Sequence, residues 1–295
     1  MSDEGLLAGQ AAVVSGGSRG VGRAVAELLG KLGAAVVVNG RNADAVEETV
    51  ASIVASGARA APLVGPADEE AVATALIETC TATFGRLDIL INCAGVAEPQ
   101  GSSILDISPD EFDRLIGAHL GTAFQTCRVA ARLMADQGHG AIINTGSVAF
   151  LGDYGGTGYP AGKGAVNALT MAIAAELKPA GVRANVVCPG AKTRLSTGAE
   201  YEQHIEDLHR RGLLDEVTMR ASLDSAPPEF VAPTYAYLAS DLARDVTGQI
   251  FVAAGGFVGR FDRPAPSLLA YRDHHDGAPW SLSDLHTMIG GTPTE

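Results

Sequence analysis

Short apolar, β-branched segments alternate along the chain with longer segments in which apolar residues recur three and four positions apart. The longer segments predict helices near residues 20–32, 42–56, 68–84, 109–136, 160–178 and 228–240. The short segments predict strands at Ala11–Ser15, Ala35–Val38, Ala60–Val64, Asp88–Asn92, Ala141–Thr145, Arg183–Cys188 and Gln249–Val252. We therefore expect an α/β fold: a doubly wound, seven-stranded parallel sheet of the Rossmann type between two layers of helices.

Two segments interrupt this alternation. Residues 193–227 are polar and helix-forming and follow a strand end, where open α/β sheets keep their ligand crevice, so they predict a substrate lid. Residues 257–295 follow the last predicted strand and contain Pro264, Pro266 and Trp280. They predict a C-terminal tail docked on the surface or on another subunit, with disorder as the alternative. Residues 6–256 contain no repeat or linker and are expected to form one catalytic domain.

Composition narrows the class of protein. Of the 295 residues, 46% are hydrophobic and 19% are charged, which excludes global disorder. The net charge of −13 repels polyanions, so no nucleic acid partner is expected. The N-terminus has no signal-peptide pattern and no long apolar run follows, so we expect a cytoplasmic protein without a membrane anchor. The four cysteines, at 80, 93, 127 and 188, lack metal-ligand spacing and are expected to be free thiols, with no metal site.

A glycine-rich turn joins the first predicted strand to the first predicted helix. Glycine permits a close approach of the backbone to a pyrophosphate, and the N–H groups at a helix start attract an anion. The strand before the turn and the helix after it favour a dinucleotide site over an ordinary glycine-rich turn, which is the alternative. The residues expected to bind the nucleotide here are Gly16, Ser18, Arg19, Gly20, Val21 and Gly22.

The segment after the second predicted strand, Asn39-Gly40-Arg41-Asn42, carries no carboxylate. An acidic residue at this place usually holds the ribose hydroxyls of NAD. Arg19 and Arg41 are instead placed to hold a ribose 2′-phosphate through charge-assisted bonds. Two solvated surface arginines are the alternative, but their joint placement favours NADP(H) over NAD(H).

Tyr159 and Lys163 lie four residues apart at a predicted helix start, hence on one helix face. A neighbouring cation is expected to lower the pKa of the phenol from about 10, which would make Tyr159 a general acid or base. A plain helix surface is the alternative. Ser147 stands twelve residues earlier, just after the fifth predicted strand, and adds weight to the catalytic interpretation.

In the order of these motifs, the chain resembles the short-chain dehydrogenases/reductases (SDRs), in their single-domain branch, over roughly residues 6–256. The motifs that carry the resemblance are Gly16/Gly20/Gly22, Asn92-Cys93-Ala94-Gly95, Ser147, Tyr159/Lys163, Asn185, Pro189-Gly190, Thr193, Gly248-Gln249 and Gly255-Gly256. The resemblance implies that Tyr159 exchanges the substrate proton, that Lys163 binds the nicotinamide ribose and tunes Tyr159, and that Ser147 holds the substrate oxygen. It further implies a cofactor cleft that includes Asn92, Ala94, Gly95, Pro189, Gly190 and Thr193.

Two departures from the family lie near the expected catalytic residues. His119 aligns with an asparagine that in the family helps a water-mediated proton relay to the lysine. We expect His119 to support catalysis, with a structural buried histidine as the alternative. The interval from Ser147 to Tyr159 is one residue shorter than usual, which a deletion within 150–152 explains. A displaced active-site loop is the alternative.

Together these features predict an NADP(H)-dependent oxidoreductase that interconverts a ketone and a secondary alcohol. The lid combines Tyr201 and His204 with leucines, which suits a bulky, partly apolar small-molecule substrate such as an acyl thioester, a polyketide or a sterol-like ketone. One alternative is an NAD-linked 3-hydroxyacyl-thioester dehydrogenase, and another is a nucleotide-sensing protein without turnover. The resemblance implies a homotetramer or homodimer built on the helices near 109–136 and 160–178.

Overall fold

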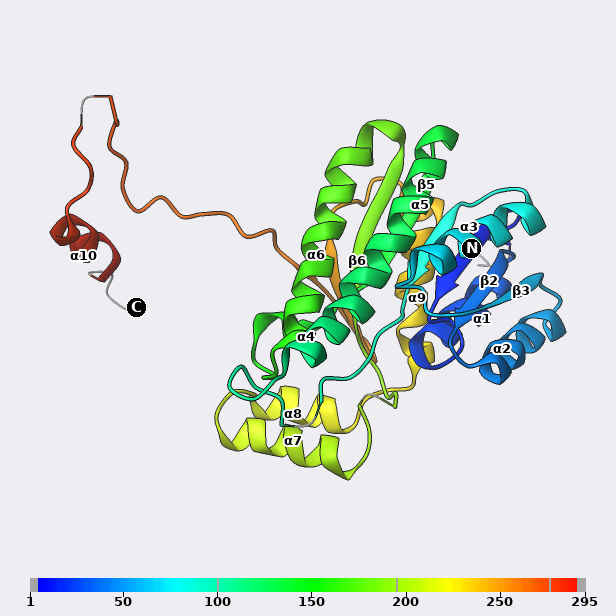
Figure 1. The fold of residues 1–295 in the computed structure, drawn as a ribbon, viewed down its shortest axis with the longest axis horizontal. Coiled ribbons are helices and arrows are strands. Elements are labelled where there is room, and N and C mark those ends of the chain that lie inside the picture. The colour runs from blue at the N-terminus through cyan, green and yellow to red at the C-terminus, as the bar shows by residue number, and fades with distance from the viewer. Residues whose placement is uncertain (1–4, 100, 195, 276, 291–295) are drawn as a thin grey trace. The chain divides into compact units, whose positions relative to one another are not determined.

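Eight strands form a single sheet in the order β3-β2-β1-β4-β5-β6-β7-β8 in the computed structural model, which describes residues 5–99, 101–194, 196–275 and 277–290 (Figure 1). All neighbouring strands are parallel except β7 and β8, which are antiparallel. The strands are β1 (Ala11–Ser15), β2 (Ala35–Gly40), β3 (Ala60–Val64), β4 (Ile89–Asn92), β5 (Gly140–Thr145), β6 (Val182–Gly190), β7 (Ile250–Ala254) and β8 (Phe257–Phe261). The expected doubly wound α/β fold is confirmed.

The helices begin and end at local signals in the sequence. Asn42 caps the helix that begins at Ala43 by accepting a hydrogen bond from the N–H of Ala45. Ser108 and Glu111 form a reciprocal capping box at the start of another helix. The helices are α1 (Gly20–Lys31), α2 (Ala43–Ala55), α3 (Glu70–Phe84), α4 (Pro109–Ile116), α5 (Thr122–Gln137), α6 (Gly158–Leu177), α7 (Ala199–Arg210), α8 (Glu216–Leu223), α9 (Ala232–Ala239) and α10 (Leu282–Gly290).

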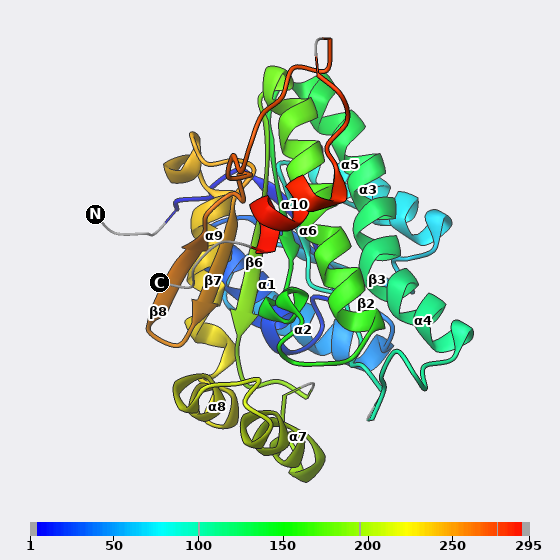
Figure 2. The same cartoon turned by 90° about the vertical axis from the view of Figure 1, so that its left-hand side faces the viewer.

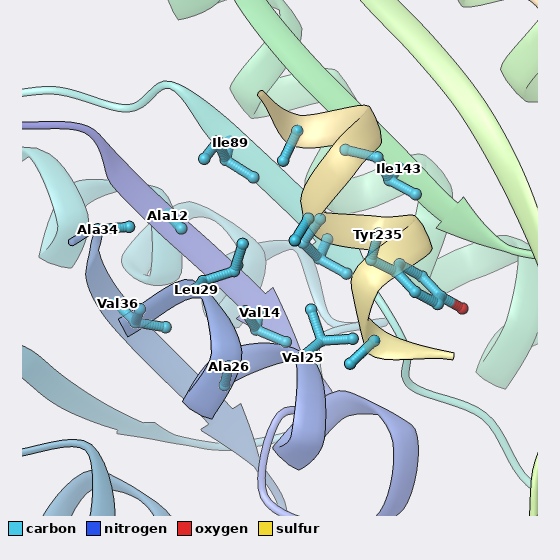
Figure 3. Packing of buried hydrophobic residues seen from close by; sticks show 14 of the residues in the cluster. Ala12, Val14, Val25, Ala26, Leu29, Ala34, Val36, Ile89, Ile143 and Tyr235 are labelled. Carbon is cyan, nitrogen blue, oxygen red and sulfur yellow. The ribbon is translucent and has the colours of Figure 1, made fainter. Parts of the chain in front are cut away.

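Two apolar layers hold the sheet between its helices. Side chains of β1 and β2 are buried on both faces, as expected for central parallel strands. Alternate residues such as Val14 and Val36 pack against α1, α2 and α9 (Figure 3). Their neighbours, such as Val13 and Val37, pack against α3, α5 and α6. Both faces are therefore covered, and the carboxyl ends of the strands are left to form the ligand crevice.

The eighth strand corrects the expectation of seven. Gly255 has a φ of +54°, and with Gly256 it forms the two-residue turn that lets Phe257 pair with Ala254. The ring of Phe261 then packs edge-on against Phe150 at 5.2 Å between centroids. The domain boundary expected at residue 256 therefore lies later, because the sheet continues to Phe261.

The chain divides into two compact units, the first ending at Phe261 and the second beginning at Asp262. The described part of the second unit contains α10 and an Arg272 guanidinium stacked 3.8 Å above the ring of Trp280. Docking of this tail stays a prediction. Within the described residues, none of the helices combines the length and the hydropathy that crossing a bilayer requires.

Candidate active site

The turn between β1 and α1 is shaped for a close approach of the backbone to a ligand. Gly16 has a φ of +70°, and a Cβ at this position would lie 2.5 Å from the backbone nitrogen of Ala94. A Cβ on Gly22 would overlap the carbonyl oxygen of Gly16. No described side chain caps the start of α1, whose N-cap is Arg19. The N–H groups of that first turn are therefore directed at an anion site, and a pyrophosphate fits it.

Two exposed arginines, Arg19 and Arg41, flank the end of β2. Arg19 donates a hydrogen bond of 3.4 Å to the side chain of Asn42. Glu48 of α2 is the nearby carboxylate, and the hydrogen bond and charge of Arg23 lower its pKa. Among the described residues neither Arg19 nor Arg41 forms an ion pair with a carboxylate.

Asn92 supports the crevice from inside the protein. Its Nδ2 donates to the Asn144 side chain at 2.9 Å, and its Oδ1 accepts from the Thr126 hydroxyl at 2.9 Å. The Asn144 amide in turn donates to the hydroxyl of Thr170 at 2.8 Å. These bonds join β4 and β5 to α5 and α6. The Asn92 side chain therefore fixes the end of β4, and its expected part in the cofactor cleft stays a prediction.

Ser147, Tyr159 and Lys163 converge at the carboxyl end of β5. Lys163 is 4% exposed and donates from Nζ to the carbonyl oxygen of Thr145 at 2.8 Å. Its Nζ lies 5.7 Å from the centroid of the Tyr159 ring. The Ser147 side chain lies close enough to Tyr159 to lower the pKa of the phenol. The shortened interval between Ser147 and Tyr159 thus still leaves the two side chains near one another, with a 3₁₀ turn at Val148–Leu151 between them.

Burial shifts the pKa of both catalytic candidates. Burial lowers the pKa of Lys163 to about 8, although Cys93 and Cys188 act in the opposite direction. Burial raises the pKa of Tyr159 above its usual value and outweighs the lowering effect of the Ser147 side chain. The lowered pKa expected for Tyr159 is wrong for this structure, because burial of the phenol dominates. A phenol with a raised pKa keeps its proton at neutral pH, as a proton donor requires.

His119 lies in a π-helical segment, Gly117–Gly121, between α4 and α5. The ring is 3% exposed and lies edge-on to the ring of Tyr159, with 4.9 Å between centroids. Nε2 lies 3.1 Å from the carbonyl oxygen of Val96. A carbonyl only accepts, so Nε2 carries the proton and Nδ1 is an acceptor. Burial, together with the charge of Lys163, lowers the pKa of His119 to about 3, so the ring is neutral.

A small cavity lies between His119 and Lys163. Its volume is about 10 Å³, which is room for one water molecule. Nδ1 of His119 is buried and has no hydrogen-bond partner among the described residues. The residues that line the cavity are Asn92, Ala94, His119, Thr122, Ala123, Asn144, Thr145, Lys163 and Val166.

The predicted lid consists of α7 and α8, which lie side by side at one end of the sheet (Figure 2). The Tyr154 hydroxyl lies 3.2 Å from the hydroxyl of Ser222 on α8. Burial raises the pKa of Tyr201 to about 12, and the neighbouring Tyr154 and Tyr159 add to this shift. Tyr201 of α7 therefore lies near Tyr159. Its apolar cluster consists of Tyr154, Tyr201, Ile205, Leu208, Leu214, Met219 and Leu223.

The end of β6 closes the crevice from the other side. Pro189 and Gly190 pair with Ala253 and Ala254 of β7. The methyl carbon of Thr193 lies 3.4 Å from where a Cβ on Gly20 would stand, so the segment after β6 faces the glycine-rich turn. This arrangement places Thr193 next to the anion site.

Comparison with known proteins decides the family. The family model described as "Enoyl-(Acyl carrier protein) reductase" matches residues 16–258, which span every element from the glycine-rich turn to the last parallel strand. The chain belongs to the short-chain dehydrogenase/reductase family. Enzymes of this family are oxidoreductases that use a nicotinamide dinucleotide, which agrees with the anion site at the start of α1.

Individual SDR proteins extend the match. The 3alpha-hydroxysteroid dehydrogenase of Mediterraneibacter gnavus is 34% identical over 85% of this chain and 97% of its own length. The hydroxyacyl-CoA dehydrogenase ChsB1 of Mycobacterium tuberculosis is 32% identical over 96% of this chain and 88% of its own. A crystal structure of a short chain dehydrogenase from Mycobacterium avium has a TM-score of 0.80 and 31% identity, over 97% of this chain and 95% of that one.

One contact in this SDR site was not expected from the sequence. The Glu98 carboxylate, in the loop after β4, accepts hydrogen bonds from the backbone N–H groups of Thr157, Gly158 and Tyr159. Threonine is a favoured N-cap residue type, so the local sequence favours capping of α6 by the Thr157 side chain itself. In the structure the Thr157 side chain makes no capping bond.

Proposed function

We propose that this protein is an NADP(H)-dependent ketoreductase that interconverts a ketone and a secondary alcohol on a bulky, partly apolar substrate. The observation that carries the proposal is the convergence of Ser147, Tyr159 and Lys163 at the carboxyl end of the sheet. When bound, the nicotinamide would supply or accept the hydride. The chain itself must then hold the substrate oxygen and move a proton to or from it.

Each of the three side chains has a role that its surroundings support. Tyr159 donates its proton to the carbonyl oxygen during reduction, since its raised pKa keeps the phenol protonated. Ser147 orients that oxygen, and the Lys163 ammonium stabilises the phenolate that forms. His119 supports the relay from the cavity, where a water would donate a hydrogen bond to its Nδ1 and would also lie beside Lys163.

The preference for NADP(H) rests on Arg19 and Arg41 and on the lack of a carboxylate at residues 39–42. Replacing Arg41 with Asp is expected to lower the NADPH-to-NADH ratio of kcat/KM by about 10- to 100-fold, the loss of one charge-assisted hydrogen bond. The control is Arg244→Asp, which makes the same charge change at a side chain 83% exposed. An unchanged ratio in the Arg41 variant contradicts the assignment.

The substrate class follows from the lid. Tyr201, which lies near Tyr159, belongs with Met219 and Leu223 to the apolar cluster of the predicted lid, and such a surface suits a fused-ring or long-chain ketone. The relative from M. gnavus is named a hydroxysteroid dehydrogenase, which supports a ring ketone. An NAD-linked 3-hydroxyacyl-thioester dehydrogenase is the second candidate, since the relative that matches 96% of this chain is named a hydroxyacyl-CoA dehydrogenase.

The experiment is a substrate panel of steroid, cyclic and 3-oxoacyl-thioester ketones, assayed with NADPH and NADH. Transfer of deuterium from [4-²H]NADPH to the carbinol carbon of a product is the expected result. Preferred turnover of 3-hydroxyacyl thioesters with NAD selects the second candidate. NADPH binding without turnover of any panel member contradicts both and favours a nucleotide sensor.

We propose further that the protein acts in the cytoplasm as a homodimer or homotetramer joined through α5 and α6. The outer face of α6 carries the small, exposed residues Ala161, Ala168 and Ala172, which permit close helix packing against a second copy. On α5, the ring of Phe124 is 47% exposed and would gain burial in the same contact.

A further inference from the structure

A carboxylate from a distant part of the chain binds the backbone N–H groups at the start of α6, the helix that carries Tyr159 and Lys163. Glu98 Oε1 accepts from the backbone N–H of Thr157 at 3.0 Å and from that of Gly158 at 3.2 Å. Glu98 Oε2 accepts from the N–H of Tyr159. One carboxylate thereby satisfies three N–H groups that have no partner within the helix, and the third belongs to the catalytic tyrosine itself.

Further contacts hold this carboxylate in place. The hydroxyl of Ser102 donates to Glu98 Oε1 at 2.8 Å. Gly156 has a φ of +77°, and a Cβ there would lie 3.1 Å from the carboxyl carbon of Glu98. Any larger residue at 156 would therefore be strained and would crowd the carboxylate.

The loop that carries Glu98 also lines the rest of the site. Gly95 packs against His119, since a Cβ at Gly95 would lie 2.9 Å from Cε1 of that ring and 3.8 Å from Nζ of Lys163. The carbonyl of Val96 accepts from His119. The loop thus contacts the imidazole, the ammonium and the backbone of the phenol. A shift of the loop would move the three groups relative to one another.

We propose that Glu98 is a positioning residue, which fixes the start of α6 so that the Tyr159 phenol is held at Ser147 and at the substrate oxygen. The role rests on the proposed ketoreductase function. The negative charge of Glu98 has a second effect: it opposes the phenolate that Tyr159 forms in the oxidation direction. Removing the charge therefore favours the phenolate while it loosens the geometry.

The test compares Glu98→Gln with Glu111→Gln, which removes a capping carboxylate of the same kind from α4. For Glu98→Gln we expect kcat to fall about tenfold while the Kd of NADPH stays unchanged. The acid limb of the kcat profile for alcohol oxidation is expected at lower pH than in the wild type. For Glu111→Gln both kcat and the acid limb are expected to match the wild type.

A second readout does not depend on turnover. The ¹³Cζ tyrosine NMR signal of Tyr159, assigned with Tyr159→Phe, is expected to move in Glu98→Gln and to stay in Glu111→Gln. An unmoved signal overturns the positioning role, whatever the activity. If the wild type turns over no panel substrate, the proposed function fails, and the NMR signal still decides the role of Glu98.

Glu98→Asp covers the case in which Glu98→Gln does not fold. It keeps the charge but withdraws the carboxylate by one methylene. We expect a lower kcat, a shifted NMR signal and an acid limb at the wild-type pH. Wild-type values for both kcat and the NMR signal would overturn the proposal.

Discussion

Lys163 shows how the surroundings of a single residue set its chemistry. Its ammonium is buried, donates to the Thr145 carbonyl and lies near His119. Burial penalises the charged form and brings the pKa of Lys163 to about 8, so the side chain is close to losing its proton at physiological pH. The free thiols nearby remain protonated, since burial raises the pKa of Cys93 to about 11 and that of Cys188 to about 12.

The pKa of Lys163 predicts a pH limit for ketone reduction. The group is charged below about pH 8 and neutral above it, so stabilisation of the Tyr159 phenolate is lost as the pH rises. We expect kcat/KM for NADPH, which reports groups of the free enzyme, to be level below about pH 8 and to fall above it. A profile that stays level to pH 10 would contradict this reading of Lys163.

Much of the site at this scale is predictable from the sequence. Tyr159, Lys163 and Ser147 follow from a helix period and a strand end, and the structure brings them together. Their pKa values were not predictable, because these depend mainly on burial in the folded chain rather than on spacing. The contact of Glu98 with the start of α6 could not be predicted from the sequence, because the backbone groups it binds lie about sixty residues away. In addition, Thr157 is a residue type that commonly caps a helix, but its side chain makes no capping bond here.

At the scale of elements, Asp88, just before β4, connects the amino ends of β1, β4 and β5. Its Oδ2 accepts from the N–H of Ala11 at the start of β1 at 2.8 Å. Its Oδ1 accepts from Arg86 at 2.7 Å and contacts His139, just before β5, at 2.9 Å. Burial raises the pKa of Asp88, but the hydrogen bonds from Arg86, Ala11 and His139 together outweigh it and lower the pKa.

A lowered pKa in the folded state predicts acid-sensitive stability. The contribution of Asp88 is fully present above its ordinary pKa of 3.8 and is lost as the pH falls through the lower value in the fold. Asp88→Asn is expected to lower the free energy of unfolding by about 2 kcal/mol at pH 7. The difference from the wild type is expected to shrink below about pH 4, as urea unfolding at several pH values measures.

The matched control is Asp245→Asn. Asp245 is 95% exposed and lies 3.8 Å from Arg244, so its removal is expected to have little effect on stability. Equal losses in the two variants would contradict a special role for the buried carboxylate.

Periodicity predicted most elements but missed two local changes. Residues 109–136 have one apolar period, yet the structure inserts the π-helical Gly117–Gly121 between α4 and α5. The spacing of apolar residues does not distinguish a single π turn from an α-helix. Gly255-Gly256 matches the closing motif of the family, which does not predict a further strand. Two glycines between apolar segments also predict a hairpin, and the structure forms one between β7 and β8.

At the scale of the whole molecule, the catalytic domain has a complete core of its own. Among the described residues, the three apolar clusters draw every member from the chain up to Ala253. Several apolar side chains of the tail are exposed, among them Leu268, Leu282 and Ile289. The expected docking of the tail on another subunit stays a prediction.

A variant that ends at Phe261 tests this division. We expect it to stay folded and to bind NADPH, because its core and its cofactor turn lie before the cut. Light scattering is expected to give the full chain two or four times its mass of 30.2 kDa. A smaller assembly after truncation would place the tail between subunits. A monomeric full chain would contradict the proposed assembly, and loss of cooperative unfolding would contradict the independence of the domain.

The central claim is that Tyr159 transfers the proton in a reduction driven by a nicotinamide cofactor. The direct measurement is single-turnover reduction of the best panel ketone by NADPH, in the wild type and in Tyr159→Phe, together with the Kd of NADPH for each. We expect the rate to fall about a thousandfold while the Kd stays within about twofold, because the phenol OH is lost and the glycine-rich turn is intact. Loss of a general acid costs about a hundredfold or more in rate. A Tyr159→Phe variant that keeps more than about a tenth of the wild-type rate would therefore contradict the account.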